Sequence, residues 1–316
     1  MDNGTKNAPK VRHLVVGDEA EGQRIDNFLI TRLKGVPRSW VYRVLRRGEV
    51  RVNKGRVKPT RRLQVGDQVR IPPLRMNEKP EGQGPGVGLR KLISRSVIHR
   101  DDDLIIINKP SGVAVHGGSG VSFGVIEVLR ALNPDAPYLE LAHRLDRDTS
   151  GCLLLARRRP ALQQFQKLQL SGKVNKRYLA LVSGRWRRDR VTVDAPLRKN
   201  ELQSGERVVR VDPRGKDSVT DFRVVKRFEG AMLVEARLQT GRTHQIRVHA
   251  AHLGTPILGD EKYGDEQTNR EYRELGLKRL FLHAWKLEFP WKDRRGGYRF
   301  EAPLPAALEE VLEKLS

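Results

Sequence analysis

Two spacings of apolar residues occur along the chain, and they divide it into two folded units. In the first unit, residues 24–34 carry apolar side chains at the spacing i, i+3, i+4 and i+8, which predicts an amphipathic helix: Ile25, Phe28, Leu29 and Leu33. Pro37 suits the first turn of a second helix. Alternating residues on both sides of Asn53-Lys54-Gly55 then predict a β-hairpin.

The second unit begins near Ser96 and has more predicted strands than helices. A continuous apolar run that ends at Asn108-Lys109-Pro110 is typical of a buried strand. Helical spacing occurs in these segments: 122–132, 160–170, 244–252 and 306–315. Strand-like runs occupy much of the rest: 152–158, 176–184, 216–228, 231–239, 283–290 and 298–305. This order predicts an α+β fold around a mixed, largely antiparallel sheet.

Segments of low apolar content set the domain boundaries. We expect residues 1–12 to be a disordered tail, because they are polar. We expect residues 74–95 to be a flexible linker, because four glycines lie between Gly82 and Gly88. The predicted domains are therefore residues 13–73 and 96–316.

The net charge of the chain indicates the chemical class of its partner. The 316 residues include 61 Lys and Arg against 38 Asp and Glu, a net charge of +23, and nucleic acid is the first candidate for a polyanionic partner. A membrane surface is the alternative, but no basic amphipathic helix or long apolar run favours it. The single cysteine, Cys152, excludes a disulfide framework and a cysteine metal cluster. The first residues lack the apolar segment of a signal peptide, so we expect a cytoplasmic protein.

The first unit is strongly basic. Residues 20–72 hold 14 Lys and Arg and 4 Asp and Glu, a net charge of +10 in about a sixth of the chain. An ordinary solvated surface is one interpretation. A face that follows nucleic-acid phosphates is the other, because four arginines lie away from the apolar positions of one short helix: Arg38, Arg43, Arg46 and Arg47.

Asp146 is the first candidate for chemistry. It lies between Arg144 and Arg147 in a segment that leads into the apolar run 152–156, so it sits at the edge of a core. A turn residue that pairs with arginine is the ordinary interpretation. However, the flanking arginines favour the ionised carboxylate even with partial burial, which suits a nucleophile or a base.

Tyr178 is the second candidate. It opens a predicted strand, and packing is the ordinary role of such a tyrosine. Beside a surface that binds RNA, its ring could instead stack on a base and its hydroxyl could handle a proton.

The helix-like segment 244–252 supplies a third candidate. His249 and His252 suggest a metal site, but no Asp or Glu within the helix completes a ligand set, and we expect no metal. An inward-facing Arg247 needs a carboxylate partner, and Asp146 is available.

Two other reaction classes lack a feature that they need. Glycoside hydrolysis requires a second acid in an apolar pocket, and the sequence offers no such pocket around Asp148. Nucleotide hydrolysis requires a phosphate loop that ends in Lys-Ser or Lys-Thr, and the glycine-rich segment 115–124 lacks that ending.

The motifs resemble one known family. The segment HRLDRDTSG, residues 143–151, is similar to the signature of the RluA-type pseudouridine synthases. The segments NKPSGVAVHGG, KRYLALV and GRTHQIRVHAAHLGTPILGDEKYG resemble further blocks of that family in the same order. The resemblance covers nearly all of residues 96–305. The first unit resembles the alpha-L (S-four-type) RNA-binding domain that many of these enzymes carry in front.

The resemblance implies a role for each matching residue. Asp146 matches the catalytic aspartate of the family. Tyr178 matches the tyrosine that stacks on the target uracil and is implicated in proton transfer, and Arg247 matches the arginine that pairs with the aspartate. Arg144 matches the arginine that enters the RNA in place of the flipped base, and Ile246 matches an aliphatic residue that packs near the base.

The implied reaction is the isomerisation of uridine within RNA. The bond from ribose to N1 of uracil breaks, the base turns, and C5 bonds to the ribose instead. Nothing is oxidised and no group is donated, so we expect no cofactor. The base must leave its stack, at a cost of roughly a few kcal/mol. Three roles for Asp146 fit this reaction: attack on the sugar, addition to the base, or removal of a ribose proton.

The substrate class rests on finer details of the resemblance. The first unit and the segment after Val115 look closest to a branch of the family that modifies large-subunit ribosomal RNA, which is therefore the expected partner of a monomeric enzyme. Transfer RNA is the alternative substrate. A non-catalytic RNA-binding protein of ribosome assembly is the alternative class, and the intact set of Asp146, Tyr178 and Arg247 argues against it.

Overall fold

The chain forms two separate compact units, residues 1–84 and 85–316. The computed structural model describes residues 11–33, 36, 38–73, 84–118, 121–201, 207–292 and 294–316. Most of the expected tail, residues 1–10, lies outside this description, and Arg12 already belongs to a strand.

The prediction of a flexible linker is wrong in its second half. Residues 74–83 lie outside the described residues, but Val87–Arg95 is a helix, α3. Leu89 and Ile93 are one helical turn apart and pack into the core of the second unit, where α3 contacts α4 (Val125–Leu132). The apolar spacing after Gly86 therefore outweighs the flexibility that the glycines suggested.

The first unit is a small sheet with two helices. Its elements are β1 (Arg12–Val15), a 3-10 turn (Asp18–Ala20), α1 (Ile25–Arg32), α2 (Arg38–Arg46), β2 (Arg51–Val52), β3 (Gly55–Arg56) and β4 (Gln68–Ile71). The strand order is β1-β4-β2-β3. The predicted hairpin is confirmed, because β2 pairs with β3 across Asn53 and Lys54, which both have positive φ. Phe28, Leu29 and Val41 join the two helices to the core.

The second unit is built on one ten-stranded sheet. Its strands are β5 (Val97–Arg100), β6 (Leu104–Lys109), β7 (Glu140–Leu141), β8 (Ser150–Ala156), β9 (Asn175–Ser183), β10 (Arg190–Asp194), β13 (Val219–Arg227), β14 (Ala231–Leu238), β15 (Leu282–Trp291) and β16 (Arg294–Glu301). The order is β10-β13-β14-β9-β15-β8-β6-β5, and β16 and β7 join at β15 and β8. The pair β15–β8 is parallel, whereas the others are antiparallel. The predicted mixed, largely antiparallel sheet is confirmed.

Strand β8 is buried on both faces of this sheet. Leu153 and Leu155 enter one core cluster, whereas Cys152, Leu154 and Ala156 enter the cluster on the other side. This arrangement explains the continuous apolar run of the sequence, because side chains of a strand point alternately to the two faces. The segment that holds Asp146 is attached directly to this rigid central strand.

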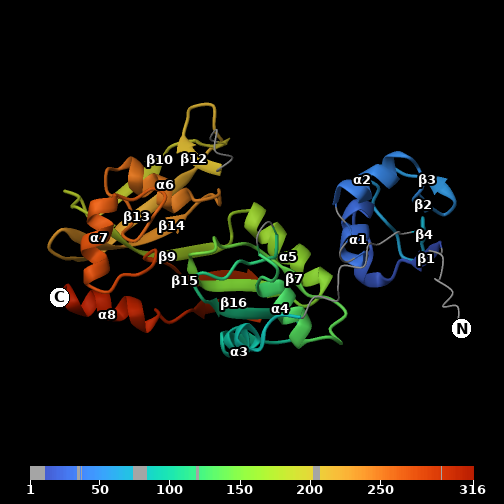
Figure 1. Ribbon diagram of the computed structural model, residues 1–316, viewed down its shortest axis with the longest axis horizontal. Helices are drawn as coiled ribbons and strands as arrows, with labels where there is room; N and C mark the ends of the chain where they lie inside the picture. The colour runs from blue at the N-terminus through green and yellow to red at the C-terminus, as the bar shows by residue number, and fades with distance from the viewer. Residues whose placement is uncertain are drawn as a thin grey trace, which may run out of the picture. The chain divides into compact units, whose positions relative to one another are not determined.

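The remaining elements cover the sheet and its ends. The helices are α5 (Arg159–Leu170), α6 (Gln245–His252), α7 (Glu266–Glu274) and α8 (Ala306–Lys314), and a separate hairpin consists of β11 (Leu197–Glu201) and β12 (Arg207–Val211). Figure 1 shows α3 and α4 together at one end of the long sheet and α6 near β13 and β14. Within the described part of the chain, no helix is long and apolar enough to cross a bilayer.

Candidate active site

Asp146 lies in the loop between β7 and β8, and a buried lysine holds this loop on one side. The Lys109 side chain is fully buried at the end of β6, and its Nζ donates to the carbonyl oxygens of Pro110 (2.7 Å), Val113 (2.7 Å) and Arg147 (2.9 Å). Burial lowers the pKa of Lys109 to about 7, whereas the three carbonyl oxygens favour the ammonium form. Sequence reasoning missed Lys109, because a lysine at the end of a strand normally points to solvent.

The other side of the loop is fixed by the Thr-Ser-Gly part of the signature. Gly151 has φ +109°, and a Cβ atom there would lie 2.2 Å from the carbonyl oxygen of Ala284, so only glycine fits. Ser150 Oγ accepts from Arg279 Nη2 (2.8 Å) and donates to His283 Nδ1 (2.9 Å), while His283 Nε2 donates to the carbonyl oxygen of Ala302 (3.1 Å). Asp146 therefore projects from a loop that is anchored at both ends.

Arg247 lies close to Asp146, but its strongest partner is Asp260. Arg247 Nη1 lies 3.9 Å from Asp146 Oδ2, an ion-pair distance without a hydrogen bond. Its Nε and Nη2 instead donate to the two oxygens of Asp260, both at 2.7 Å. The proposed pairing of Arg247 with Asp146 is thus present as a long ion pair, and the sequence analysis missed the second, bidentate partner Asp260, which compensates the buried guanidinium.

Asp260 is held firmly enough to serve as that acceptor. Its side chain is fully buried, and Oδ1 also accepts from the backbone N–H groups of Lys262 (2.9 Å) and Tyr263 (3.1 Å). The sequence contains Asp260 in its Gly-Asp-Glu-Lys-Tyr-Gly segment, but nothing local indicates that its partner lies 13 residues earlier, on α6.

His244 and Tyr263 complete the surroundings of Asp146. His244 Nε2 lies 3.8 Å from Asp146 Oδ2, and His244 Nδ1 lies 2.8 Å from the Tyr263 hydroxyl. Arg247 stacks over the Tyr263 ring, with its Cζ 5.0 Å from the ring centroid. Sequence reasoning gave neither residue a role. The side chain of Asp146 stays 23% exposed and so remains accessible to a substrate.

The other predicted residues of the second unit divide between buried and exposed positions. Tyr178 is buried on β9, and burial together with the charge of nearby Asp146 raises the pKa of its hydroxyl. Ile246 is buried on α6 within the core cluster that contains Tyr178. Arg144 is exposed, and its guanidinium has no hydrogen bond or ion pair with the residues that the structure describes. Tyr178 is thus a buried neighbour of Asp146, and Arg144 is an exposed cation two residues before it.

The predicted arginines of the first unit lie on or just after α2. The side chains of Arg43, Arg46 and Arg47 are exposed, as expected for a surface that contacts phosphates. Arg47 makes a long ion pair of 3.8 Å with Glu49, and both groups are largely solvated. Arg38 belongs to the helix, but its side chain lies outside the described residues.

His249 is a structural residue. Its side chain is fully buried, with Nδ1 2.9 Å from Thr220 Oγ1 and Nε2 3.0 Å from the carbonyl oxygen of Ala195. Both ring nitrogens are therefore occupied by protein atoms, which leaves neither for a metal ion.

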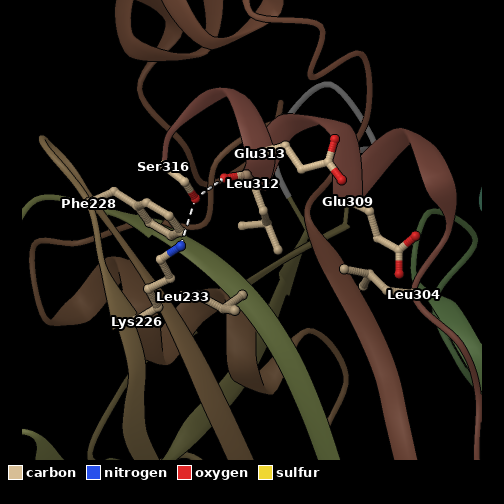
Figure 2. Close-up of a pocket in the computed structure, with 8 residues that line it drawn as sticks. All are labelled: Lys226, Phe228, Leu233, Leu304, Glu309, Leu312, Glu313 and Ser316. Carbon is tan, nitrogen blue, oxygen red and sulfur yellow. Dashed lines mark hydrogen bonds between the residues drawn. The ribbon is translucent and has the colours of Figure 1, made fainter.

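A separate pocket of about 370 Å³ lies beside α8 (Figure 2). It is lined by Lys226, Phe228, Leu233, Leu304, Glu309, Leu312, Glu313 and Ser316. Figure 2 shows the carboxylates of Glu309 and Glu313 at its rim, and Lys226 Nζ donates to Ser316 Oγ (2.6 Å). None of the residues around Asp146 lines this pocket, and its carboxylates would repel RNA phosphates.

The chain matches known proteins over almost its whole length. Residues 103–252 match the RNA pseudouridylate synthase family, and residues 23–69 match the S4 domain. The chain is 51% identical over 306 residues to ribosomal large subunit pseudouridine synthase C of Haemophilus influenzae, covering 96% of this chain and 95% of that protein. The chain belongs to the RNA pseudouridylate synthase family. The protein of the same name from Escherichia coli strain K12 is 51% identical over 310 residues, 97% of each chain.

Solved structures of this family agree with the fold. Human RNA pseudouridylate synthase domain containing 4 superposes with a TM-score of 0.60 at 29% identity, covering 72% of this chain and 95% of that one. Human RNA pseudouridylate synthase domain containing 1 gives 0.56 at 27% identity, covering 70% and 94%. The predicted fold, an α+β pseudouridine synthase domain preceded by an S4 domain, is confirmed.

The family match includes only part of the geometry around Asp146. Asp146, Tyr178 and Arg247 lie within the matched residues 103–252, whereas Asp260 and Tyr263 follow them. The surroundings of Asp146 thus include a segment outside the matched range, which supplies the bidentate partner of Arg247.

Proposed function

We propose that the protein isomerises specific uridines to pseudouridine in large-subunit ribosomal RNA. One observation carries the proposal: a partly exposed carboxylate on an anchored loop, Asp146, lies against a buried arginine and a buried tyrosine from segments far apart in sequence. The two bacterial relatives are named for the large ribosomal subunit, which supports the substrate class.

Each residue of the site receives a role in this proposal. Asp146 is the reacting carboxylate, and Arg247 orients it. Tyr178 lies under the uracil and keeps its proton, because burial and Asp146 disfavour the phenolate. Arg144 takes the place of the flipped base in the RNA, and Ile246 packs near the uracil.

RNA binding is assigned in this proposal to the basic surface of the first unit. The exposed side chains of Arg43, Arg46 and Arg47, together with Arg38, follow phosphates. The protein acts as a monomer in the cytoplasm. It uses no cofactor, because the isomerisation neither oxidises the substrate nor adds a group to it. The anchored loop must instead retain the cleaved uracil and exclude water.

Mapping of pseudouridines tests the substrate class. Large-subunit ribosomal RNA from cells that lack the protein should contain unmodified uridines at positions that are pseudouridine in the parent cells. Purified protein should restore those positions in a transcript of the same RNA. Loss of pseudouridine from transfer RNA alone would instead favour the transfer RNA enzyme. Tight binding of ribosomal RNA without any conversion would favour a non-catalytic assembly protein.

A further inference from the structure

A chain of polar contacts leads from strand β12 to Asp146. The backbone N–H of Val209 donates to the hydroxyl oxygen of Tyr263 (3.0 Å), which lies 2.8 Å from His244 Nδ1. His244 Nε2 in turn lies 3.8 Å from Asp146 Oδ2. Because Val209 occupies a lone pair of the hydroxyl, the Tyr263 proton is free to be donated to Nδ1. The imidazole then carries its own proton on Nε2, which faces Asp146.

Burial of His244 favours this neutral form. Burial lowers the pKa of His244, and Arg247 and Lys262 lower it further, while Asp146 and Asp260 act in the opposite direction. A neutral imidazole has one donor nitrogen and one acceptor nitrogen, so the bond to Tyr263 decides which nitrogen donates.

The backbone conformation of His244 also indicates that the surrounding structure holds this residue in place. His244 has φ +55°, in the left-handed region that residues with a side chain rarely adopt, and it caps the N-terminus of α6. The adjacent Gln245 side chain fixes this turn through its contacts with Thr240, Arg242 and Thr220. Strained residues persist where the surrounding structure holds them, and they cluster at functional sites.

Two donors therefore approach one oxygen of Asp146. Arg247 Nη1 is 3.9 Å and His244 Nε2 is 3.8 Å from Oδ2. Such contacts are often long without substrate and shorten when it binds. We propose that His244, held by Tyr263, is a positioning residue that fixes the Asp146 carboxylate through Oδ2 in the orientation that meets the target nucleotide. This inference rests on the proposed function.

The substitution His244→Gln distinguishes a positioning role of His244 and Tyr263 from a purely structural one. The amide nitrogen of a glutamine can take the place of His244 Nε2 as a donor to Asp146, and an amide has no tautomer for Tyr263 to fix. His244→Asn tolerates the left-handed backbone but is too short to place a donor there. We therefore compare the wild type, Y263F, H244Q, H244Q/Y263F and H244N. The measurements are the single-turnover rate of pseudouridine formation, the Kd for the same RNA and thermal unfolding.

The positioning role predicts a rate effect that depends on residue 244. In the wild type, Tyr263→Phe should lower the single-turnover rate about 10- to 100-fold with an unchanged Kd. In the H244Q background, the same change should lower it less than about threefold. H244N should be slower than H244Q.

Two results would overturn the inference. Equal losses from Tyr263→Phe in both backgrounds would show that Tyr263 acts only through the fold, and a change in Kd without a change in rate would make His244 a binding residue. These results leave the proposed function intact, because the wild type still converts uridine. A wild-type protein that converts no uridine would overturn the proposed function itself, so the two failures are distinguishable.

Discussion

At the scale of single residues, Asp260 and Asp146 differ in their exposure to solvent, and this difference separates their roles. Asp260 is fully buried and neutralises Arg247 through two hydrogen bonds, whereas Asp146 is partly exposed and shares that cation only at 3.9 Å. Because Asp260 compensates the buried charge, Asp146 is not needed as the structural partner of Arg247. It can therefore interact with a substrate.

Asp260→Asn should destabilise the fold. The substitution leaves a buried guanidinium without its counter-charge, and breaking such a pair costs about 3–5 kcal/mol of unfolding free energy. Urea denaturation measures the change. Asp148→Asn is the matched control, because its side chain is exposed, and its effect should be within about 0.5 kcal/mol. Equal stability of the two variants would contradict a structural role for Asp260.

Asp146→Asn should abolish turnover and keep RNA binding. The amide has nearly the same shape, but it removes the charge that the proposed chemistry needs. Pseudouridine formation in a ribosomal RNA transcript measures turnover, and salt-matched binding assays measure affinity. Measurable turnover by this variant would refute the assignment of Asp146 as the reacting group.

Sequence alone could indicate only some of these residues. Asp146 and Arg247 stand in motifs that resemble a known family, and their types suit the chemistry. Lys109, Asp260 and Tyr263 act through partners that the fold brings near, such as the carbonyl oxygen of Arg147, 38 residues after Lys109. No local pattern encodes such contacts.

At the scale of elements, the parallel junction of β8 and β15 carries the site. His283 pairs in register with Ser150, and the hydrogen bond between their side chains joins the two strands just after the Asp146 loop. The apolar run of β8 made that strand predictable from the sequence. The hairpin of β11 and β12 was not predicted. Among the residues that the structure describes, its small core contains three buried side chains, Leu197, Val209 and Val248, so the sequence shows no long apolar pattern there.

The junction of β8 and β15 predicts a pH dependence of stability. Burial lowers the pKa of His283 to about 4, from about 6.5 in an unfolded chain. Between these values the unfolded chain binds a proton that the folded chain does not, so stability falls as the pH falls from 6.5 towards 4. The contribution of His283 between pH 6.5 and 4.5 is about 2 kcal/mol.

The variant His283→Gln isolates this contribution. Its unfolding free energy should be lower at pH 6.5, but its further loss between pH 6.5 and 4.5 should be about 2 kcal/mol smaller than that of the wild type. Other titrating groups cancel in the difference between the two proteins. The same pH dependence in both would contradict a neutral His283 in the fold.

At the scale of the whole molecule, the net charge of +23 favours RNA, but charge alone does not say where RNA binds. The first unit has an S4 domain and exposed arginines on or just after α2, and the second unit contains Asp146, the carboxylate that we propose to react. Binding strength and chemistry should therefore respond to substitutions in different units.

Replacement of Arg43, Arg46 and Arg47 by glutamine in the full chain should weaken RNA binding and leave the chemical step intact. Each lost phosphate contact lowers the slope of log K against log salt by about 0.7–0.9, so the slope should fall by about 2 to 3. The single-turnover rate at saturating RNA should stay at the wild-type value. A charge-matched control replaces three exposed cations of the second unit, Arg270, Arg273 and Lys278, by glutamine. If both triple variants lose the same slope, the effect comes from net charge, and α2 is not a phosphate-binding surface.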